Sequence, residues 1–331
     1  MPTTPHPVRT FRAPPGLGHR HVQSLLGGWP LRQRLVRRRA ARLLGAARVE
    51  VLDCGDGVRL LGYFSPSATA SRGLAILLHG WEGSADASYV LSVGAKLHEA
   101  GYDIFRLNFR DHGATLELNR DLFHSCRIDE VVGAVRSITA AHPASRTFLV
   151  GHSLGGNFAM RVAVRAPAAG IPLTKVVAIC PVLRPHSTMV ALEEGFWVYR
   201  EYFLHRWRQT LRAKAACFPE LYDFGDLRRF PTLTATTEFF ATRYAGFADL
   251  DSYLQGYAVT GDVLRGLTVP TRVIAAADDP VIPSADLVNL AGGPALQIDV
   301  LPRGGHCGFL ESYRLRSWLD REVLAELDAA R

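Results

Sequence analysis

Residues 147–156 read TFLVGHSLGG, a short apolar run that leads into a glycine-rich turn. The first four residues predict a buried strand, and the residues from Leu154 onward predict a helix. Between them, Gly151, Ser153 and Gly155 form a G-x-S-x-G pattern. In a strand–turn–helix context, glycines at these places allow two backbone segments to approach closely. We therefore expect the Ser153 hydroxyl to stand above the edge of a sheet.

Strand-sized apolar runs alternate with helical patterns on both sides of this stretch. A hairpin is predicted over 49–64, around a turn at 55–57. Further strands are predicted at 74–78, 102–108, 147–150, 175–180, 271–276 and 296–301, and helices at 89–100, 128–141, 154–166 and after each of the last two strands. Strands that are apolar throughout and separated by helices form parallel sheets covered on both faces. The pattern predicts an α/β fold with a doubly wound, mostly parallel sheet.

One segment interrupts this alternation. Residues 186–262 contain no convincing strand and hold 16 of the 31 aromatic residues. We predict a helical cap over 186–262, inserted before the last two strands. The core then comprises 49–185 and 263–331, and residues 1–48 form a basic N-terminal arm. The aromatic rings of the cap either line a pocket or pack the cap onto the core, and both roles are compatible.

A serine hydroxyl is a weak nucleophile at neutral pH and needs a general base. His306 is the best candidate, because it lies in a glycine-rich loop after the last predicted strand, at the sheet edge where the Ser153 turn opens. An acid that orients this base is expected between serine and histidine in chain order. Asp278 and Asp279 follow the strand at 271–276. Either carboxylate fits this place, and an Asx turn is the alternative role for both.

The negative charge that develops on a carbonyl oxygen under attack needs backbone N–H donors. The Leu154 N–H, at the start of the helix, is the first candidate donor. The second is the Trp81 N–H, in the loop that reads HGWEGS over 79–84. One such donor lowers the barrier by about 3 kcal/mol. The Trp81 side chain either lines the acyl site or takes part in ordinary aromatic packing.

These motifs, in this order, resemble the α/β-hydrolase superfamily and, within it, the YheT-like branch of predicted esterases. The matching segments are FRAP at 11–14, GLGHRHVQSL at 16–25, HGWEGS at 79–84, NFR at 108–110, GHSLGGN at 151–157, DDP at 278–280 and GHCGF at 305–309. The resemblance spans nearly the whole chain and implies the α/β-hydrolase fold. Acids before Pro-x-x-Pro recur at this place in the superfamily, which favours Asp279 as the orienting acid and leaves Asp278 to bond nearby backbone.

The chain departs from that branch just after the NFR segment. It reads DHG over 111–113, where the branch has a glycine, and a polar block follows over 118–129. Asp111, His112 and His124 either lie near the mouth of a pocket or belong to a hydrogen-bonded loop that holds its own backbone, and we favour the loop. No further ligands lie at suitable spacing, so we predict no metal site.

Composition excludes several classes of protein. Of the 331 residues, 48% are hydrophobic and 21% are charged, which excludes a disordered chain. No apolar run approaches the roughly 18 residues of a membrane span, and residues 1–12 lack the apolar core of a secretory signal. The cysteines are Cys54, Cys126, Cys180, Cys217 and Cys307. Without a C-x-x-C pair they are expected to be reduced and mostly buried. We expect a cytoplasmic protein without a cofactor.

The net charge of +7 arises in the first fifty residues, which hold ten arginines and one acid. Residues 30–47 predict a basic amphipathic helix with Leu31, Leu35 and Leu43 or Leu44 on one stripe. We favour an arm that packs on the core with its arginines in solvent. Weak contact with an anionic membrane surface is the alternative. No nucleic-acid partner is expected, because no aromatic residues or motifs accompany the charge.

These residues together predict a serine hydrolase that cleaves a small-molecule carboxylic ester with an apolar acyl group. Ser153 attacks the acyl carbonyl, His306 accepts the serine proton, and Asp279 orients the imidazole. The N–H groups of Leu154 and Trp81 bind the oxyanion. An acyltransferase that uses the same triad and a non-catalytic, hydrolase-like ligand-binding module are the alternatives. A histidine with its ordinary pKa predicts that kcat/KM falls as pH drops through roughly 6 to 7.

Overall fold

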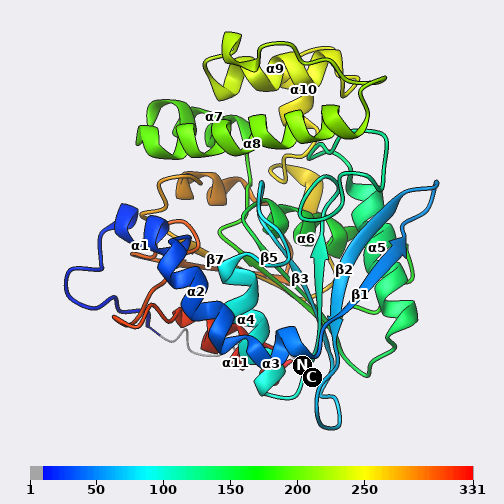
Figure 1. Ribbon diagram of the computed structural model, residues 1–331. Coiled ribbons are helices and arrows are strands. Elements are labelled where there is room, and N and C mark those ends of the chain that lie inside the picture. The colour runs from blue at the N-terminus through cyan, green and yellow to red at the C-terminus, as the bar shows by residue number, and fades with distance from the viewer. Residues whose placement is uncertain (1–9, 331) are drawn as a thin grey trace.

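Within the described residues, eight strands form one sheet (Figure 1), in the order β1-β2-β4-β3-β5-β6-β7-β8. The computed structural model of the protein describes residues 10–330. The strands are β1 (Arg48–Asp53), β2 (Arg59–Ser65), β3 (Leu74–Leu78), β4 (Asp103–Asn108), β5 (Thr147–His152), β6 (Lys175–Ile179), β7 (Thr271–Ala276) and β8 (Leu296–Leu301). β2 pairs antiparallel with β1 and with β4, and the other neighbours are parallel. The predicted fold class is confirmed.

Helices cover both faces of the sheet (Figure 1). The helices of the core are α4 (Ser88–Glu99), α5 (Ile128–Ala141), α6 (Leu154–Arg165) and α11 (Trp318–Ala329). In β3, Leu74, Ile76 and Leu78 belong to the apolar cluster with α5 and α6, whereas Ala75 and Leu77 belong to the cluster with α4 and α11. Both faces of the strand are buried, which explains its continuous apolar run.

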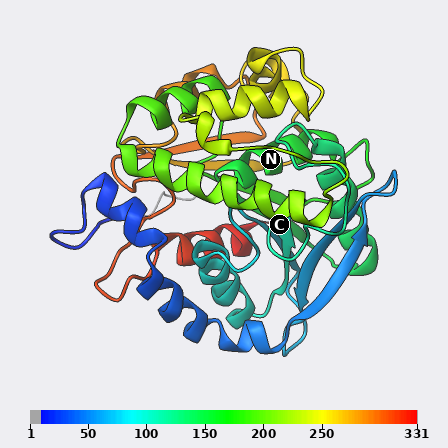
Figure 2. The same ribbon diagram turned by 45° about the horizontal axis from the view of Figure 1, so that its top comes forward.

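The segment between β6 and β7 forms the helical cap, which lies above the sheet (Figures 1 and 2). Its helices are α7 (Pro185–Glu194), α8 (Trp197–Cys217), α9 (Leu233–Arg243) and α10 (Leu250–Gln255). Thr232 and Asp249 cap the N-termini of α9 and α10 with their side chains. The helix predicted directly after β7 is wrong in type, since only the 3₁₀ helix η3 (Ser284–Asn289) lies there.

The single amphipathic helix predicted over 30–47 is also wrong. The chain forms α1 (Arg20–Gly27), α2 (Pro30–Arg39) and α3 (Ala41–Gly45), with a break at Ala40. Leu31, placed on the buried stripe by the prediction, is 54% exposed, whereas Arg32 is buried. The Arg32 guanidinium donates to the carbonyls of Gly27 and Leu315, and these bonds replace the water that it loses.

The N-terminal arm therefore packs on the core through Arg32, Val36, Ala40 and Leu43. The part of the predicted arm at residues 1–9 lies outside the described residues. Within 10–330, every helix is too short or too polar to cross a bilayer. The contact between this arm and a membrane surface stays a prediction.

A buried ion pair joins the cap to the core. Lys214 of α8 donates to Asp111 Oδ1 at 2.8 Å and to the carbonyl oxygens of Leu116 and Asn119. Both side chains of the pair are almost fully excluded from solvent. Asp111 has φ 59°, the left-handed conformation that glycine adopts most readily. Asp111 thus adopts a conformation typical of glycine and uses its carboxylate to hold the cap.

Removing the cation of this pair should destabilise the fold. We expect Lys214→Met to lower the free energy of unfolding by about 3–5 kcal/mol, because it leaves the Asp111 carboxylate buried without a counter-charge. The double variant Asp111→Asn/Lys214→Met should lose less, since asparagine tolerates a positive φ and carries no charge. Urea unfolding measures both values.

The matched control is the exposed pair between Arg265 and Asp262, where Arg265→Met should cost less than about 1 kcal/mol. A Lys214→Met protein as stable as this control would contradict the structural role of the buried pair.

Candidate active site

Ser153 lies in a strained turn between β5 and α6. Its φ of 54° and ψ of −120° are unusual for a residue with a β-carbon. A β-carbon on Gly151 would collide with the Gly155 carbonyl, and one on Gly155 would collide with the His79 carbonyl. The two glycines of the G-x-S-x-G pattern are therefore required by close backbone contacts, as predicted.

Three strand ends bring Ser153, His306 and Asp279 together. Ser153 Oγ lies 3.0 Å from His306 Nε2, and His306 Nδ1 lies 2.9 Å from Asp279 Oδ2. The other oxygen of Asp279 accepts the N–H groups of Val281 and Ile282, which fix its orientation. The arrangement can transfer a proton from the serine hydroxyl to an imidazole that a carboxylate orients.

The loop that carries His306 is held from two directions. Asp278 Oδ1 accepts the Gly305 N–H at 2.9 Å, so Asp278 bonds nearby backbone and only Asp279 faces the imidazole. From α1, Ser24 Oγ accepts the His306 N–H at 2.8 Å. Gln23 of the same helix is fully buried and exchanges two hydrogen bonds with the Leu310 backbone. Sequence reasoning assigned no role to Ser24 or Gln23, although both lie in the segment 16–25 that carries the family resemblance.

The two backbone donors predicted to bind the oxyanion make no hydrogen bonds within the described residues. Within residues 10–330, neither the Leu154 N–H nor the Trp81 N–H has a hydrogen-bond partner. The Trp81 ring stacks on Phe203 at 5.1 Å and meets Trp207 edge-on at 5.3 Å. It also lines the pocket beside Ser153, and a role in an acyl site stays a prediction.

The cap holds the loop that contains Trp81. Glu82, the next residue, has φ 55°, and its N–H donates to His112 Nε2 at 3.1 Å. From α8, Thr210 donates to Glu82 Oε2 at 2.7 Å and Arg206 donates to the Glu82 carbonyl. Helix α8 thereby fixes the backbone on which the Trp81 N–H depends. Sequence reasoning missed this contact, since Thr210 is distant in the chain and carries no motif.

The histidines near the site have structural roles. His112 Nδ1 lies 2.7 Å from the Arg110 carbonyl, so His112 belongs to the hydrogen-bonded loop favoured from the sequence. His79 is fully buried and its Nε2 accepts the Phe109 N–H. His124 packs edge-on against Phe247, and burial lowers the pKa of its imidazole to about 3, which keeps it neutral.

The pocket beside Ser153 is mostly apolar and lies between core and cap. Core residues that line it include Ser153, Leu154, Trp81, Phe123, Val281 and Ile282, and cap residues include Met189, Leu192, Phe203, Trp207, Phe240 and Tyr257. Other cap rings pack against each other instead, as Phe224 does between Tyr222 and Tyr244. The aromatic residues of the cap thus divide between lining the pocket and packing the cap.

The fold and this site define an α/β hydrolase. Residues 75–315 match the alpha/beta hydrolase family, and the chain belongs to it. The YheT-like branch within it stays a prediction.

Known proteins similar to this chain are distant. The Synechocystis protein named "Putative esterase slr0264" is 22% identical over 317 residues, 83% of this chain and 85% of that protein. The Pyrococcus furiosus esterase Pf2001 is 15% identical with a TM-score of 0.58, over 98% of this chain and 99% of that one. A proline iminopeptidase from Mycobacterium smegmatis is 18% identical with a TM-score of 0.53, over 86% of this chain and 100% of that one. These structural similarities show the fold alone, and a shared fold does not determine which type of bond an enzyme cleaves.

The environment of His306 shifts the expected pH dependence of kcat/KM to higher pH than the sequence alone predicts. Burial lowers the pKa of His306, but the Asp279 carboxylate and its hydrogen bond contribute to a net rise to about 9. Only the neutral imidazole can accept the Ser153 proton. We therefore expect kcat/KM to rise with pH and to reach half its plateau near pH 9, above the window of an ordinary histidine.

The pH profile of kcat/KM on a chromogenic ester measures this midpoint, with Ser153→Ala supplying the background hydrolysis. Asp279→Asn should move the midpoint of the residual activity to lower pH, because it removes the Asp279 charge, which raises the pKa of His306 more than Cys307 does. A parent profile already flat at pH 7 would contradict the raised pKa.

The contact from α1 to the catalytic loop should matter for turnover. Ser24→Ala removes the acceptor of the His306 N–H, and we expect kcat to fall by about 10-fold with KM little changed. Ser24→Thr should restore the loss, since it keeps a hydroxyl. Ser137→Ala, which removes a hydroxyl that bonds the distant Asp53 carbonyl, is the matched control. Equal kcat values in Ser24→Ala and Ser137→Ala would rule out a positioning role.

Proposed function

We propose that this protein is a serine hydrolase that cleaves carboxylic esters through an acyl-enzyme on Ser153. The observation that carries the proposal is the unbroken chain of contacts from Asp279 Oδ2 through His306 to Ser153 Oγ, at 2.9 and 3.0 Å. This chain ends at an apolar pocket that Ser153 itself lines. A ligand-binding module needs no such proton path.

The reaction follows from the geometry in two halves. Ser153 Oγ attacks the acyl carbonyl while His306 Nε2 accepts its proton, and the imidazolium then protonates the leaving alcohol. Water enters, gives its proton to His306 and releases the acid from Ser153. In both halves the Leu154 and Trp81 N–H groups bind the oxyanion, each lowering the barrier by about 3 kcal/mol.

An ester with an apolar acyl group is the proposed substrate class. Phe203, Trp207 and Phe240 give the pocket an aromatic wall, against which hydrocarbon loses contact with water. The relatives named as esterases support ester cleavage, whereas the iminopeptidase is named for a different bond. A panel of p-nitrophenyl esters of graded acyl length, set beside proline p-nitroanilide, separates these possibilities.

Labelling with a fluorophosphonate probe tests the nucleophile. The parent protein should label, and Ser153→Ala and His306→Ala should not. In the ester assay both variants should lose roughly 10⁴-fold or more in kcat. Ser125→Ala, which removes a hydroxyl that also lines the pocket, is the control and should still label.

Three results would overturn the proposal. Labelling that persists in Ser153→Ala would place the nucleophile elsewhere. A folded parent protein that neither labels nor turns over any ester would favour the ligand-binding module. With an added alcohol, a new ester in place of free acid would identify an acyltransferase instead.

A further inference from the structure

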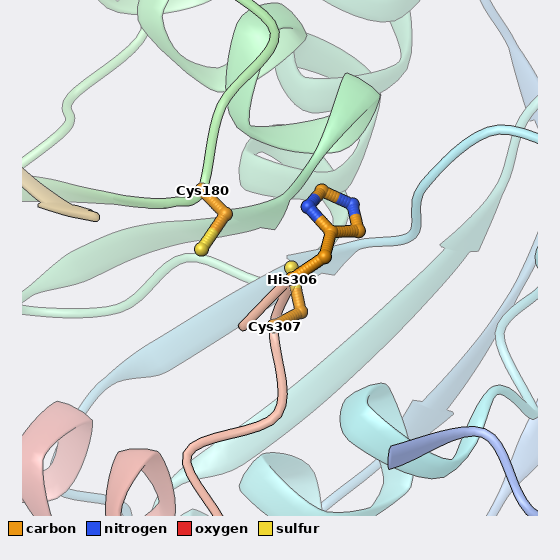
Figure 3. A group of neighbouring side chains, drawn as sticks. All are labelled: Cys180, His306 and Cys307. Carbon is orange, nitrogen blue, oxygen red and sulfur yellow. The ribbon is translucent and has the colours of Figure 1, made fainter. Parts of the chain in front are cut away.

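Two cysteines gather beside the general base, although they are far apart in the sequence. Cys180 directly follows β6 and Cys307 directly follows His306 (Figure 3). One ligand atom from each of Cys180, His306 and Cys307 lies within 4.8 Å of the other two. The cysteines are free thiols, and the proposed reaction uses neither of them.

The backbone holds both cysteines in a conformation that favours this meeting. Cys180 has φ 42° and Cys307 has φ 55°, both in the left-handed region that residues with a β-carbon rarely adopt. The Cys180 N–H donates to the Ile274 carbonyl at 2.8 Å, which ties that residue to β7. Such strain persists where the surrounding structure determines it, and it clusters at functional sites.

The two thiols contact each other, and their hydrogen bonds to backbone carbonyls are long. Cys180 Sγ lies 3.9 Å from the Gly305 carbonyl, and Cys307 Sγ lies 3.9 Å from the Ile179 carbonyl. Little is lost when either thiol exchanges its contact for a stronger bond. Two thiols and one imidazole form a donor set that suits Zn²⁺ and other thiophilic cations.

We propose that Cys180, Cys307 and His306 form an inhibitory site for a thiophilic divalent cation, of which Zn²⁺ is the type. Zinc–sulfur bonds of about 2.3 Å place two sulfurs about 3.8 Å apart in a tetrahedral site. Ligand atoms that already lie within 4.8 Å of one another need shifts of about 1 Å or less. Binding releases the two thiol protons, and the proton of any His306 imidazolium, to solvent.

Inhibition follows from the contacts of His306. Its Nδ1 contacts Asp279 and its Nε2 contacts Ser153, so either nitrogen must leave a triad partner to bind the cation. Metal binding and proton transfer from Ser153 are therefore mutually exclusive. The inhibition of ester cleavage rests on the proposed function. The metal site itself does not require the protein to be an esterase.

Zinc affinity, measured by competition with a chromophoric chelator, tests the site without any activity assay. The parent protein should bind one Zn²⁺, and Cys180→Ser and Cys307→Ser should each weaken binding by roughly 100-fold or more, since even outer-shell partners cost 10–100-fold. Cys217→Ser, which alters a thiol of the cap, is the control and should bind like the parent.

Two further measurements use the parent protein, so they stand even where a variant fails to fold. Zn²⁺ should protect Cys307 from alkylation by iodoacetamide, and EDTA should restore the reaction. Zn²⁺ should also block fluorophosphonate labelling reversibly. Absence of stoichiometric zinc binding, or equal affinity in the parent and both site variants, would overturn the proposal. Zinc binding to a protein that hydrolyses no ester would retain the metal site and reject only the esterase.

Discussion

The turn at Ser153 is the constraint on which the site depends. A positive φ at a residue with a β-carbon costs of order 1–3 kcal/mol, so the turn persists only where its surroundings enforce it. The Ser153 N–H donates to the Ile179 carbonyl of β6, and the adjoining glycines let α6 begin against the ends of the strands. The sheet therefore fixes the orientation of the Ser153 hydroxyl.

Elements outside the sheet then complete the geometry around that fixed hydroxyl. Helix α1 supplies Ser24 to the His306 loop, and α8 supplies Thr210 and Arg206 to the loop that bears Trp81. The arm and the cap thus help to hold the loops that carry the proposed catalytic residues. Their contacts are polar and directional, whereas the pocket between them is largely apolar.

Much of the fold and the central residues could be predicted from local patterns. Apolar runs such as Leu74–Leu78 indicate buried parallel strands. The close backbone contacts around Ser153 require glycines, which are recognisable in the sequence GHSLG. The remainder depends on contacts between distant segments. Arg32 is buried because it donates to carbonyls of α1 and of the loop before α11. The hydrophobic periodicity of the sequence does not predict these bonds. The raised pKa of His306 and the meeting of Cys180 with Cys307 likewise arise only when strand ends converge.

In the proposed reaction an ester passes its acyl group to Ser153. Rapid mixing with excess p-nitrophenyl ester, followed by acid quenching and peptide mass spectrometry, tests it directly. We expect a burst of p-nitrophenol equal to the enzyme concentration and an acyl mass on the peptide that contains Ser153. Turnover with the acyl mass on Cys307 would contradict acylation of Ser153. Turnover with no burst and no acylated peptide would contradict it as well.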